Sequence, residues 1–359
     1  MRTEAAPATA PPARRAPGVR WPWLLVGVAA VFVALVAGLA FGPVSLPPGA
    51  VAAEVLNLIP GVHIHSGLSE REAAIVVSLR LPRVVLGLLV GAMLSLAGGC
   101  YQGTFRNPLA DPYLLGAASG AGLAVTAVVA FRGAEVGVGR LPAGTPIAAF
   151  AGALGAVGLT YLLGVAGRDR TPAALILAGV AVTAFLQAAQ TYLMQRNADD
   201  IRQIYSWLLG RLATNGWDEI LLLLPYAVVT AVVVLLLRRE LDVLAVGDDE
   251  AAGLGLHPQR SRYLLLAAAS LGTAAAVAVS GLIGFVGIVV PHIVRMLAGT
   301  SYRAILPLSM LFGGAFLALA DLVGRTVAAP AEVPIGVVTA FLGGPFFVFV
   351  LRRARRVVT

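Results

Sequence analysis

The sequence contains no lysine, since all 26 of its basic residues are arginine. A P-loop ATPase needs the lysine of the GxxxxGK motif to reach the β- and γ-phosphates of ATP, so this chain cannot carry such a site. Chemistry through a lysine Schiff base is excluded on the same ground. Any P-loop ATP hydrolysis that drives this protein must therefore take place on another chain.

Cysteine and charge are also scarce. The single cysteine, Cys100, excludes an intrachain disulfide and a thiolate metal cage. Charged residues make up 12% of the chain, about half of the usual share, whereas 58% of the residues are hydrophobic. This composition excludes a disordered chain, a nucleic-acid module and an ordinary cytosolic enzyme, and the net charge of +8 is too thinly spread to form a basic face. It predicts a membrane protein.

Candidate catalytic or metal-binding groups are few. His63 and His65 form an HIH motif in a long connection, but a metal site would need at least one further ligand, so we interpret the motif as part of a solvated loop. The sequence suggests no Ser/His/Asp or Cys/His arrangement. We therefore predict no catalytic residue, no metal ligand and no cofactor bound by this chain.

Ten stretches approach the roughly 20 apolar residues that a membrane-spanning helix needs. They are residues 21–42, 82–104, 113–131, 145–166, 173–194, 218–237, 262–280, 282–298, 304–323 and 335–351. The boundary at 280–282 is the least distinct, and the long connections are 43–81, 195–217 and 238–261. We predict an all-α polytopic membrane protein with about ten transmembrane helices, several of them broken or short.

The chain divides into one transmembrane domain, at 21–351, and two tails. Residues 1–20 are predicted to be a disordered cytoplasmic tail and residues 352–359 a basic cytoplasmic tail. A secretory signal is the alternative for the amino terminus, but its apolar region would be about 7–15 residues, which is shorter than 21–42. With the amino terminus inside, most arginines fall on the cytoplasmic side, which predicts that both termini are cytoplasmic.

Glycine is abundant, with 41 residues. Gly87 and Gly91 form a GxxxG motif, as do Gly116 and Gly120. Small residues let helix backbones approach in lipid, so we interpret most of these glycines as packing surfaces. Prolines are predicted to break or end helices at Pro108, Pro112, Pro291, Pro330, Pro334 and Pro345. Broken helices must be buried or line a cavity, which favours a transporter over an anchor.

Few polar residues lie inside the apolar stretches. Gln187 and Thr191 are four residues apart and share a helix face, with Gln190 adjacent to it. A substrate path and interhelical hydrogen bonding are both open interpretations. Asp321 and Arg325 are also four apart, and a self-satisfied ion pair near a helix end is the favoured interpretation of Asp321. No chain of buried carboxylates and histidines suggests a proton relay, which argues against a proton-driven secondary transporter.

Several long motifs occur between residues 80 and 352. They are RLPRVVLGLLVGAMLSLAGGCYQGTFRNPLADPYLLGAASGAG at 80–122, WLLG at 207–210, GLIGFVGIVVPHIVR at 281–295 and LADLVGRTVAAPAEVPIGVVTAFLGGPFF at 319–347. Through these motifs the chain resembles the FecCD family, the permease subunits of binding-protein-dependent ABC importers for iron–siderophore complexes, haem and vitamin B12. The resemblance implies ten transmembrane helices per subunit, two subunits around a central path, and two cytoplasmic ATPase subunits.

The resemblance assigns a docking role to three arginines. Arg80 and Arg83 of the RLPR motif and Arg325 of the LADxxxR motif would face the extracytoplasmic side, where arginines of the family bind glutamates of the solute-binding protein. Guanidinium groups bind carboxylates in bidentate geometry. The alternatives are that Arg80 and Arg83 only anchor a helix at the headgroups and that Arg325 pairs with Asp321.

The resemblance also places short coupling helices at about 245–258, where they would enter a cleft of each ATPase. The residues assigned to this contact are Asp248, Glu250, Gly253, Leu254 and Gly255. Acidic residues at the start of a short helix are favoured by its dipole, and Gly253 and Gly255 allow a tight turn between two such helices. A plain solvated loop is the alternative.

Two further residues match positions of the cytoplasmic gate in the family. Asn107 and Leu109 lie in the RNPLADP motif, and Asn107 precedes a proline, which biases it to extended backbone. The connection from Arg168 to Pro172 corresponds to the other gate element.

The resemblance predicts a permease subunit that moves a siderophore–iron chelate into the cytoplasm by ATP-driven alternating access. Its expected partners are a second copy of itself or a close paralogue, two ATPase subunits that bind ATP and magnesium, a solute-binding protein and membrane lipid, without nucleic acid. We expect a multi-pass protein of the cell membrane. The alternatives are a corrinoid or haem importer permease and, from another class, an ion-coupled secondary transporter or channel.

Overall fold

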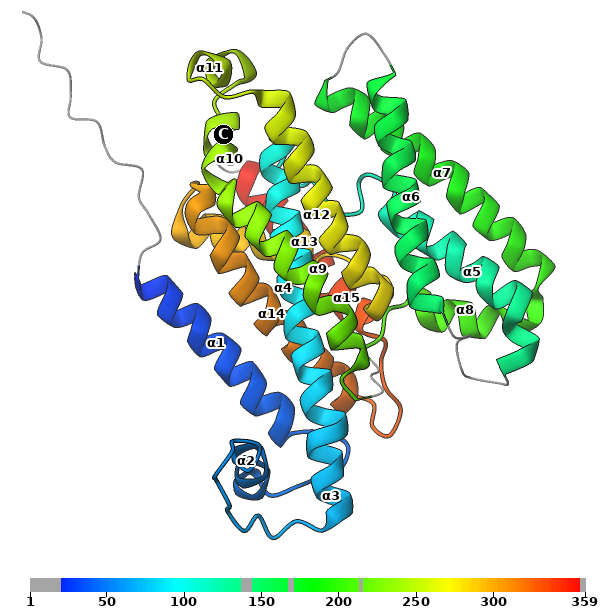
Figure 1. Ribbon diagram of the computed structural model, residues 1–359, viewed down its shortest axis with the longest axis vertical. Coiled ribbons are helices and arrows are strands. Elements are labelled where there is room, and N and C mark those ends of the chain that lie inside the picture. Colours follow the sequence, from blue (N-terminus) through cyan, green and yellow to red (C-terminus); the bar gives the residue numbers. More distant parts are fainter. Residues whose placement is uncertain (1–20, 137–143, 167–170, 213–215, 356–359) are drawn as a thin grey trace, which may run out of the picture.

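The computed structural model describes residues 21–136, 144–166, 171–212 and 216–355. Within these ranges the chain is helical, with no β-strand. The helices pack side by side, with α4 in the interior of the bundle (Figure 1). The short helices α2 and α3 lie at one end, here called the α2 end, and α10 and α11 lie at the opposite end, here called the α11 end.

Ten long helices form the bundle. They are α1 (Trp21–Ala40), α4 (Leu81–Thr104), α5 (Ala117–Val136), α6 (Thr145–Val165), α7 (Pro172–Arg196), α9 (Asp218–Leu236), α12 (Pro258–Ser280), α13 (Val286–Ala298), α14 (Tyr302–Thr326) and α15 (Ile335–Arg355). Short elements fill the connections between them. They are α2 (Pro48–Leu56), α3 (Glu70–Ala74), a π-helical stretch (Ile75–Arg80), a 3-10 turn (Ala198–Asp200), α8 (Ile201–Leu208), α10 (Arg238–Leu244) and α11 (Asp248–Gly253).

Each of the ten predicted spans coincides with one long helix. Seven helical stretches are long and apolar enough to cross a membrane, and the apolar parts of α5, α13 and α15 are shorter. The predicted end of a span at residue 280 is confirmed, because α12 ends at Ser280, but the next helix, α13, begins at Val286 and not at 282, after a non-helical segment. Which side of the membrane each end of the bundle faces stays a prediction.

The helix that contains the RLPR motif begins earlier than expected. The predicted span starts at residue 82, but α3, the π-helical stretch and α4 form one helical segment from Glu70 to Thr104. Ser69 and Glu72 start it with a reciprocal capping box. Pro82 does not end the helix, because it follows the π-helical stretch, where the hydrogen-bond register has already changed.

Two of the predicted proline breaks are wrong. Pro291 lies inside α13 and Pro345 inside α15, and both helices continue past them. By contrast, Pro108 and Pro112 lie in the non-helical segment 105–116 that separates α4 from α5. Helix α15 also continues to Arg355, into the predicted basic tail, whereas residues 1–20 and 356–359 lie outside the described ranges.

Small residues bring the helix backbones into contact, as the glycine motifs predicted. A Cβ atom added to Gly91 would overlap the carbonyl oxygen of Gly313, so α4 and α14 touch backbone to backbone. Gly98 makes the same kind of contact with the carbonyl oxygen of Gly287 on α13. In a membrane the lipid is as apolar as the side chains, so no hydrophobic force drives helices together, and close packing at glycine stabilises their contact instead. These contacts fix α4 between α13 and α14.

Candidate functional site

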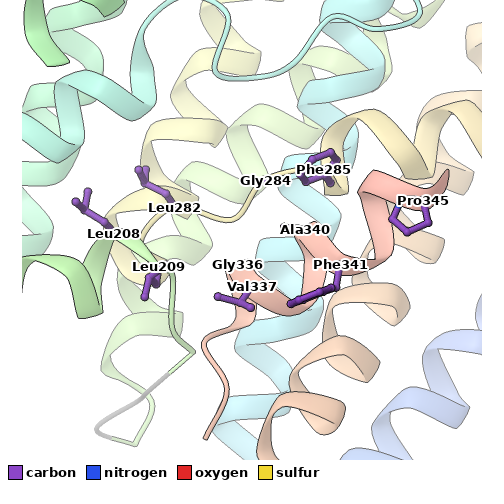
Figure 2. Close-up of a pocket in the computed structure, with 10 residues that line it drawn as sticks. All are labelled: Leu208, Leu209, Leu282, Gly284, Phe285, Gly336, Val337, Ala340, Phe341 and Pro345. Carbon is purple, nitrogen blue, oxygen red and sulfur yellow. The ribbon is translucent and has the colours of Figure 1, made fainter. Parts of the chain in front are cut away.

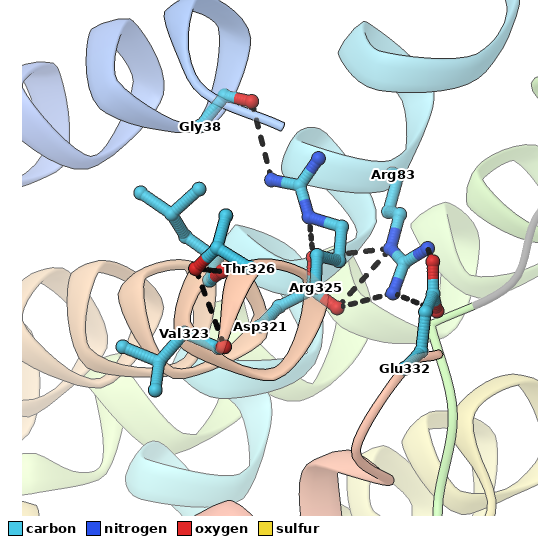
Figure 3. A network of polar contacts seen from close by, with 8 residues as sticks. Gly38, Arg83, Asp321, Val323, Arg325, Thr326 and Glu332 are labelled. Carbon is cyan, nitrogen blue, oxygen red and sulfur yellow. Dashed lines mark hydrogen bonds and ion pairs between the residues drawn. The ribbon is translucent and has the colours of Figure 1, made fainter. Parts of the chain in front are cut away.

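A buried charge network lies at the α2 end, where α4 and α14 meet (Figure 3). Asp321 on α14 is its centre. Arg83 Nε and Nη2 donate to Asp321 over 2.8–3.1 Å, and Arg325 Nε lies 3.0 Å from Asp321 Oδ2. The other edge of the Arg83 guanidinium donates to both carboxylate oxygens of Glu332, each over 2.9 Å. One arginine therefore binds two carboxylates in fork geometry.

Two arginines of this region hold the end of α1. Arg80 Nη1 donates to the carbonyl oxygen of Leu39 over 2.8 Å, and Arg325 Nη2 donates to that of Gly38 over 3.2 Å. Carbonyl groups at the end of a helix have no partner within the helix, and a guanidinium satisfies them well. Arg80 and Arg325 are only 4% and 3% exposed. Both side chains therefore join α1 to the bundle.

The structure places the three predicted docking arginines in one region, at the α2 end. The predicted ion pair between Asp321 and Arg325 is confirmed. Arg83 retains 19% side-chain exposure and Glu332 48%, so these two form the accessible edge of the network. The hydrogen bonds from Arg83 lower the pKa of Glu332, which keeps its carboxylate charged. The docking role of the three arginines stays a prediction.

The predicted coupling segment, at about 245–258, contains one short helix, α11, at the α11 end, and α10 lies just before it. Its coupling role stays a prediction. As predicted, α11 begins with Asp248, Asp249 and Glu250, and Leu254 beyond it is 71% exposed. The expected turn lies elsewhere, because the glycine between the two short helices is Gly247, with φ +140°. Gly253 and Gly255 instead lead from α11 to α12.

Asp248 attaches α11 to the long helices. Its Oδ1 accepts from Arg262 Nη2 on α12 over 2.9 Å and from Arg106 Nη2, just beyond α4. Burial raises the pKa of Asp248, but the two arginines outweigh it, so the pKa lies below its ordinary value. The segment is thereby bound to two long helices through one carboxylate.

The predicted gate residues lie in the non-helical segment 105–116. Asn107 Oδ1 accepts from the backbone N–H of Leu109 over 2.9 Å, and both residues are exposed. Farther along, the Tyr113 hydroxyl donates to the carbonyl oxygen of Ile283 over 3.0 Å and accepts from its N–H over 3.1 Å. The segment is thus joined to the break between α12 and α13. Of the other gate element, residues 167–170 lie outside the described ranges.

The polar residues of α7 point in two directions. Thr191 donates to the carbonyl oxygen of Gln187 over 2.9 Å, and both side chains are exposed on one face. Gln190 is only 8% exposed and packs against Gly122 on α5. Gln190 therefore lies in a contact between helices, while Gln187 and Thr191 remain available on the exposed face. Their role in a path stays a prediction.

An apolar cavity of about 500 Å³ lies between α8, the break before α13, and α15 (Figure 2). Leu208 of α8, Leu282 and Phe285 of the break, and Val337 and Phe341 of α15 line it. None of its lining residues is charged. No sequence pattern indicated this cavity, because its walls come from three segments that are far apart in the chain and every residue that lines it is apolar.

Single hydrogen bonds hold the three walls together. The N–H of Arg211 donates to the carbonyl oxygen of Ser280 over 2.7 Å, and the N–H of Gly336 donates to that of Leu209 over 3.0 Å. Phe285 has a φ of +70°, which is unusual for a residue with a Cβ atom, and its ring packs against Gly343 of α15. Irregular backbone at membrane depth is expected only where it is buried or lines such a cavity.

The model of the FecCD transport family matches residues 30–353. The chain is 42% identical over 297 residues to the cobalamin import system permease protein BtuC of Halobacterium salinarum, covering 83% of this chain and 78% of that protein. It is 36% identical over 331 residues to the Fe(3+)-citrate import system permease protein YfmE of Bacillus subtilis, covering 92% and 94%. A solved inward-facing structure of a putative metal-chelate type ABC transporter has a TM-score of 0.79 and 28% identity, covering 93% of this chain and 100% of that one. The chain belongs to the FecCD transport family of ABC transporter permeases.

Proposed function

We propose that this permease imports an iron chelate as a pair of subunits, driven by two ATPase subunits and supplied by a solute-binding protein. The observation that carries the proposal is the α10–α11 segment. It does not span the membrane, it is fixed to the long helices by Asp248, and it presents the exposed side chain of Leu254. Together with the match to the FecCD transport family and to permease proteins of import systems, this fixed segment at one end of the bundle is the surface that we assign to the ATPase contact.

The apolar cavity supports a bulky substrate. Its walls carry no charged side chain, so they would hold a chelate weakly and release it readily. Selectivity would then belong to the binding protein. We rank an iron chelate first, in line with the iron-citrate permease among the relatives, and corrinoid and haem import as the alternatives.

The proposal is tested by purification and reconstitution. The chain should co-purify with an ATPase, and the complex in proteoliposomes should hydrolyse ATP faster when the loaded binding protein is added. Ligand binding by the solute-binding protein encoded alongside identifies the substrate. Transport by the pure chain alone under a proton gradient would instead establish the ion-coupled alternative and overturn the proposal.

A Gly253→Leu variant should lose ATPase capture by at least about tenfold, or ~1.4 kcal/mol. A Cβ atom at Gly253 meets no atom of this chain within 4 Å, so the substitution leaves the fold intact and acts only on a partner. Pull-down of the ATPase at several concentrations measures the effect. Gly49→Leu on α2 is the matched control, since that position is equally open but lies at the opposite end. Equal capture by both variants would place the coupling surface elsewhere.

A Glu332→Ala variant should bind the loaded binding protein about two- to tenfold more tightly at low salt. Glu332 now occupies the outer edge of the Arg83 guanidinium, and its removal leaves that edge free for a carboxylate of the binding protein. The gain should vanish at high salt, because the contact is exposed.

Docking affinity can be measured with the complex in nanodiscs, and Glu70→Ala at the exposed start of α3 is the control. Unchanged or weaker docking of the Glu332→Ala variant would exclude Arg83 as the contact. Reversing the charges of Arg80, Arg83 and Arg325 together is a poorer test, because the structure uses these side chains to hold α1 and Asp321.

A further inference from the structure

A second carboxylate, on α10, binds the start of α14. Asp242 Oδ1 accepts from the backbone N–H of Tyr302 over 2.6 Å, and its Oδ2 accepts from the Ser301 hydroxyl over 2.8 Å. Arg303 Nε lies 3.4 Å from the same oxygen. The first N–H groups of a helix lack partners within it, and a negative charge there is favoured by the helix dipole. Asp242 therefore acts as a cap on a helix that begins 60 residues later in the chain.

The two carboxylates of the coupling segment bind different long helices. Asp248 binds Arg106, just beyond the end of α4, and Arg262, at the start of α12. Asp242 binds the start of α14. The apolar contacts of α10 come from Leu241 and Leu244, which are fully buried. The segment would therefore stay in place without Asp242, but its direct polar link to α14 would be lost.

Helix α14 joins the two ends of the molecule. It runs from Tyr302 to Thr326 without a break, although Pro307 lies inside it. Its last turns carry Asp321 and Arg325, the centre of the network at the α2 end. Backbone contact at Gly91 and Gly313 packs it tightly against α4. A continuous helix that is bound at both ends offers a path along which a displacement of one end can reach the other.

We propose that Asp242 is the positioning residue that links the α10–α11 segment to α14, so that a displacement of the segment by the ATPase is passed to α14 and along it to the arginine network. The inference rests on the proposed function and adds the residue through which its two ends communicate. A contact between two sites becomes a coupling only when its removal changes the response of one to the other.

The test uses the chain in complex with its ATPase and binding protein in proteoliposomes. Asp242→Ala should keep ATPase capture and basal hydrolysis, while stimulation by the loaded binding protein falls about fivefold or more. Asp242→Asn keeps an acceptor for the Tyr302 N–H, so it should restore part of the stimulation. Glu70→Ala, which removes an exposed carboxylate outside the α10–α11 segment, is the control and should behave as the unchanged protein.

A measurement on the chain alone shows whether the contact itself was broken. Hydrogen exchange at the first turn of α14 should accelerate in Asp242→Ala and not in Glu70→Ala. Accelerated exchange with full stimulation would overturn the inference, because the contact would then be broken without any effect on the coupling. Loss of ATPase capture would overturn it as well, because Asp242 would then only hold the segment in place. If Asp242→Ala does not fold, Asp242→Asn takes its place, and accelerated exchange at the first turn of α14 together with full stimulation overturns the inference. If the unchanged chain captures no ATPase, the proposed function itself fails.

Discussion

An Asp321→Ala variant is expected to lose about 3–5 kcal/mol of folding stability, the usual cost of removing one partner from a buried ion pair. Asp321 is 3% exposed and is bound by both Arg83 and Arg325. Without Asp321, the Arg325 guanidinium keeps its hydrogen bond to the carbonyl oxygen of Gly38 but is no longer neutralised by that carboxylate. The neighbouring arginines Arg83 and Arg80 then repel it. The loss can be measured by thermal unfolding and by denaturant titration of the purified protein in detergent.

Two further variants decide whether unpaired charge causes this loss. Adding Arg325→Met to Asp321→Ala should recover part of the stability, because it removes the buried cation that lacks a partner. Glu70→Ala, which removes an exposed carboxylate at the same end, should unfold as the unchanged protein does. If Asp321→Ala were as stable as Glu70→Ala, the network would contribute nothing to the fold.

A Gly98→Ala variant should fail to pack α4 against α13, at a cost of at least about 3 kcal/mol, the upper end of the range for overpacked sites. The added methyl group would overlap the carbonyl oxygen, carbonyl carbon and Cα atom of Gly287, all of which are backbone atoms that cannot rotate away. The yield of monodisperse protein and its unfolding temperature measure the effect.

Gly158→Ala on α6 is the matched control for Gly98→Ala. A Cβ atom at Gly158 meets nothing within 4 Å, and alanine is the better helix former, so stability should stay equal or rise slightly. Equal unfolding temperatures of the two variants would mean that α4 and α13 approach each other less closely than the structure has them.

The long helices were predictable from the sequence because hydropathy alone defines them. Each predicted apolar stretch from Trp21 onward coincides with a helix, and the least distinct boundary, at 280–282, is where α12 ends. The short elements were not predictable in the same way. Helix α8 and the start of the Glu70 helix lie in connections with no long apolar run, and capping and local hydrogen bonding determine them.

The candidate site was predictable only where partners are close in the sequence. Asp321 and Arg325 are four residues apart on one helix, so their pairing followed from spacing. Arg83 lies 238 residues from Asp321, and Glu332 and Asp242 bind groups on other helices. Their contacts depend on how the helices pack, which periodicity does not reveal.

The bonds around the apolar cavity determine how it can change shape. Within the described part of the chain, the residues that follow α8 are joined to the end of α12 at Ser280 and to α15 at Gly336, by one backbone hydrogen bond each. Each such bond contributes about 1 kcal/mol net, whereas the long helices carry one bond per residue. A change in the shape of the cavity would therefore break these isolated bonds first, while every long helix keeps its own hydrogen bonds.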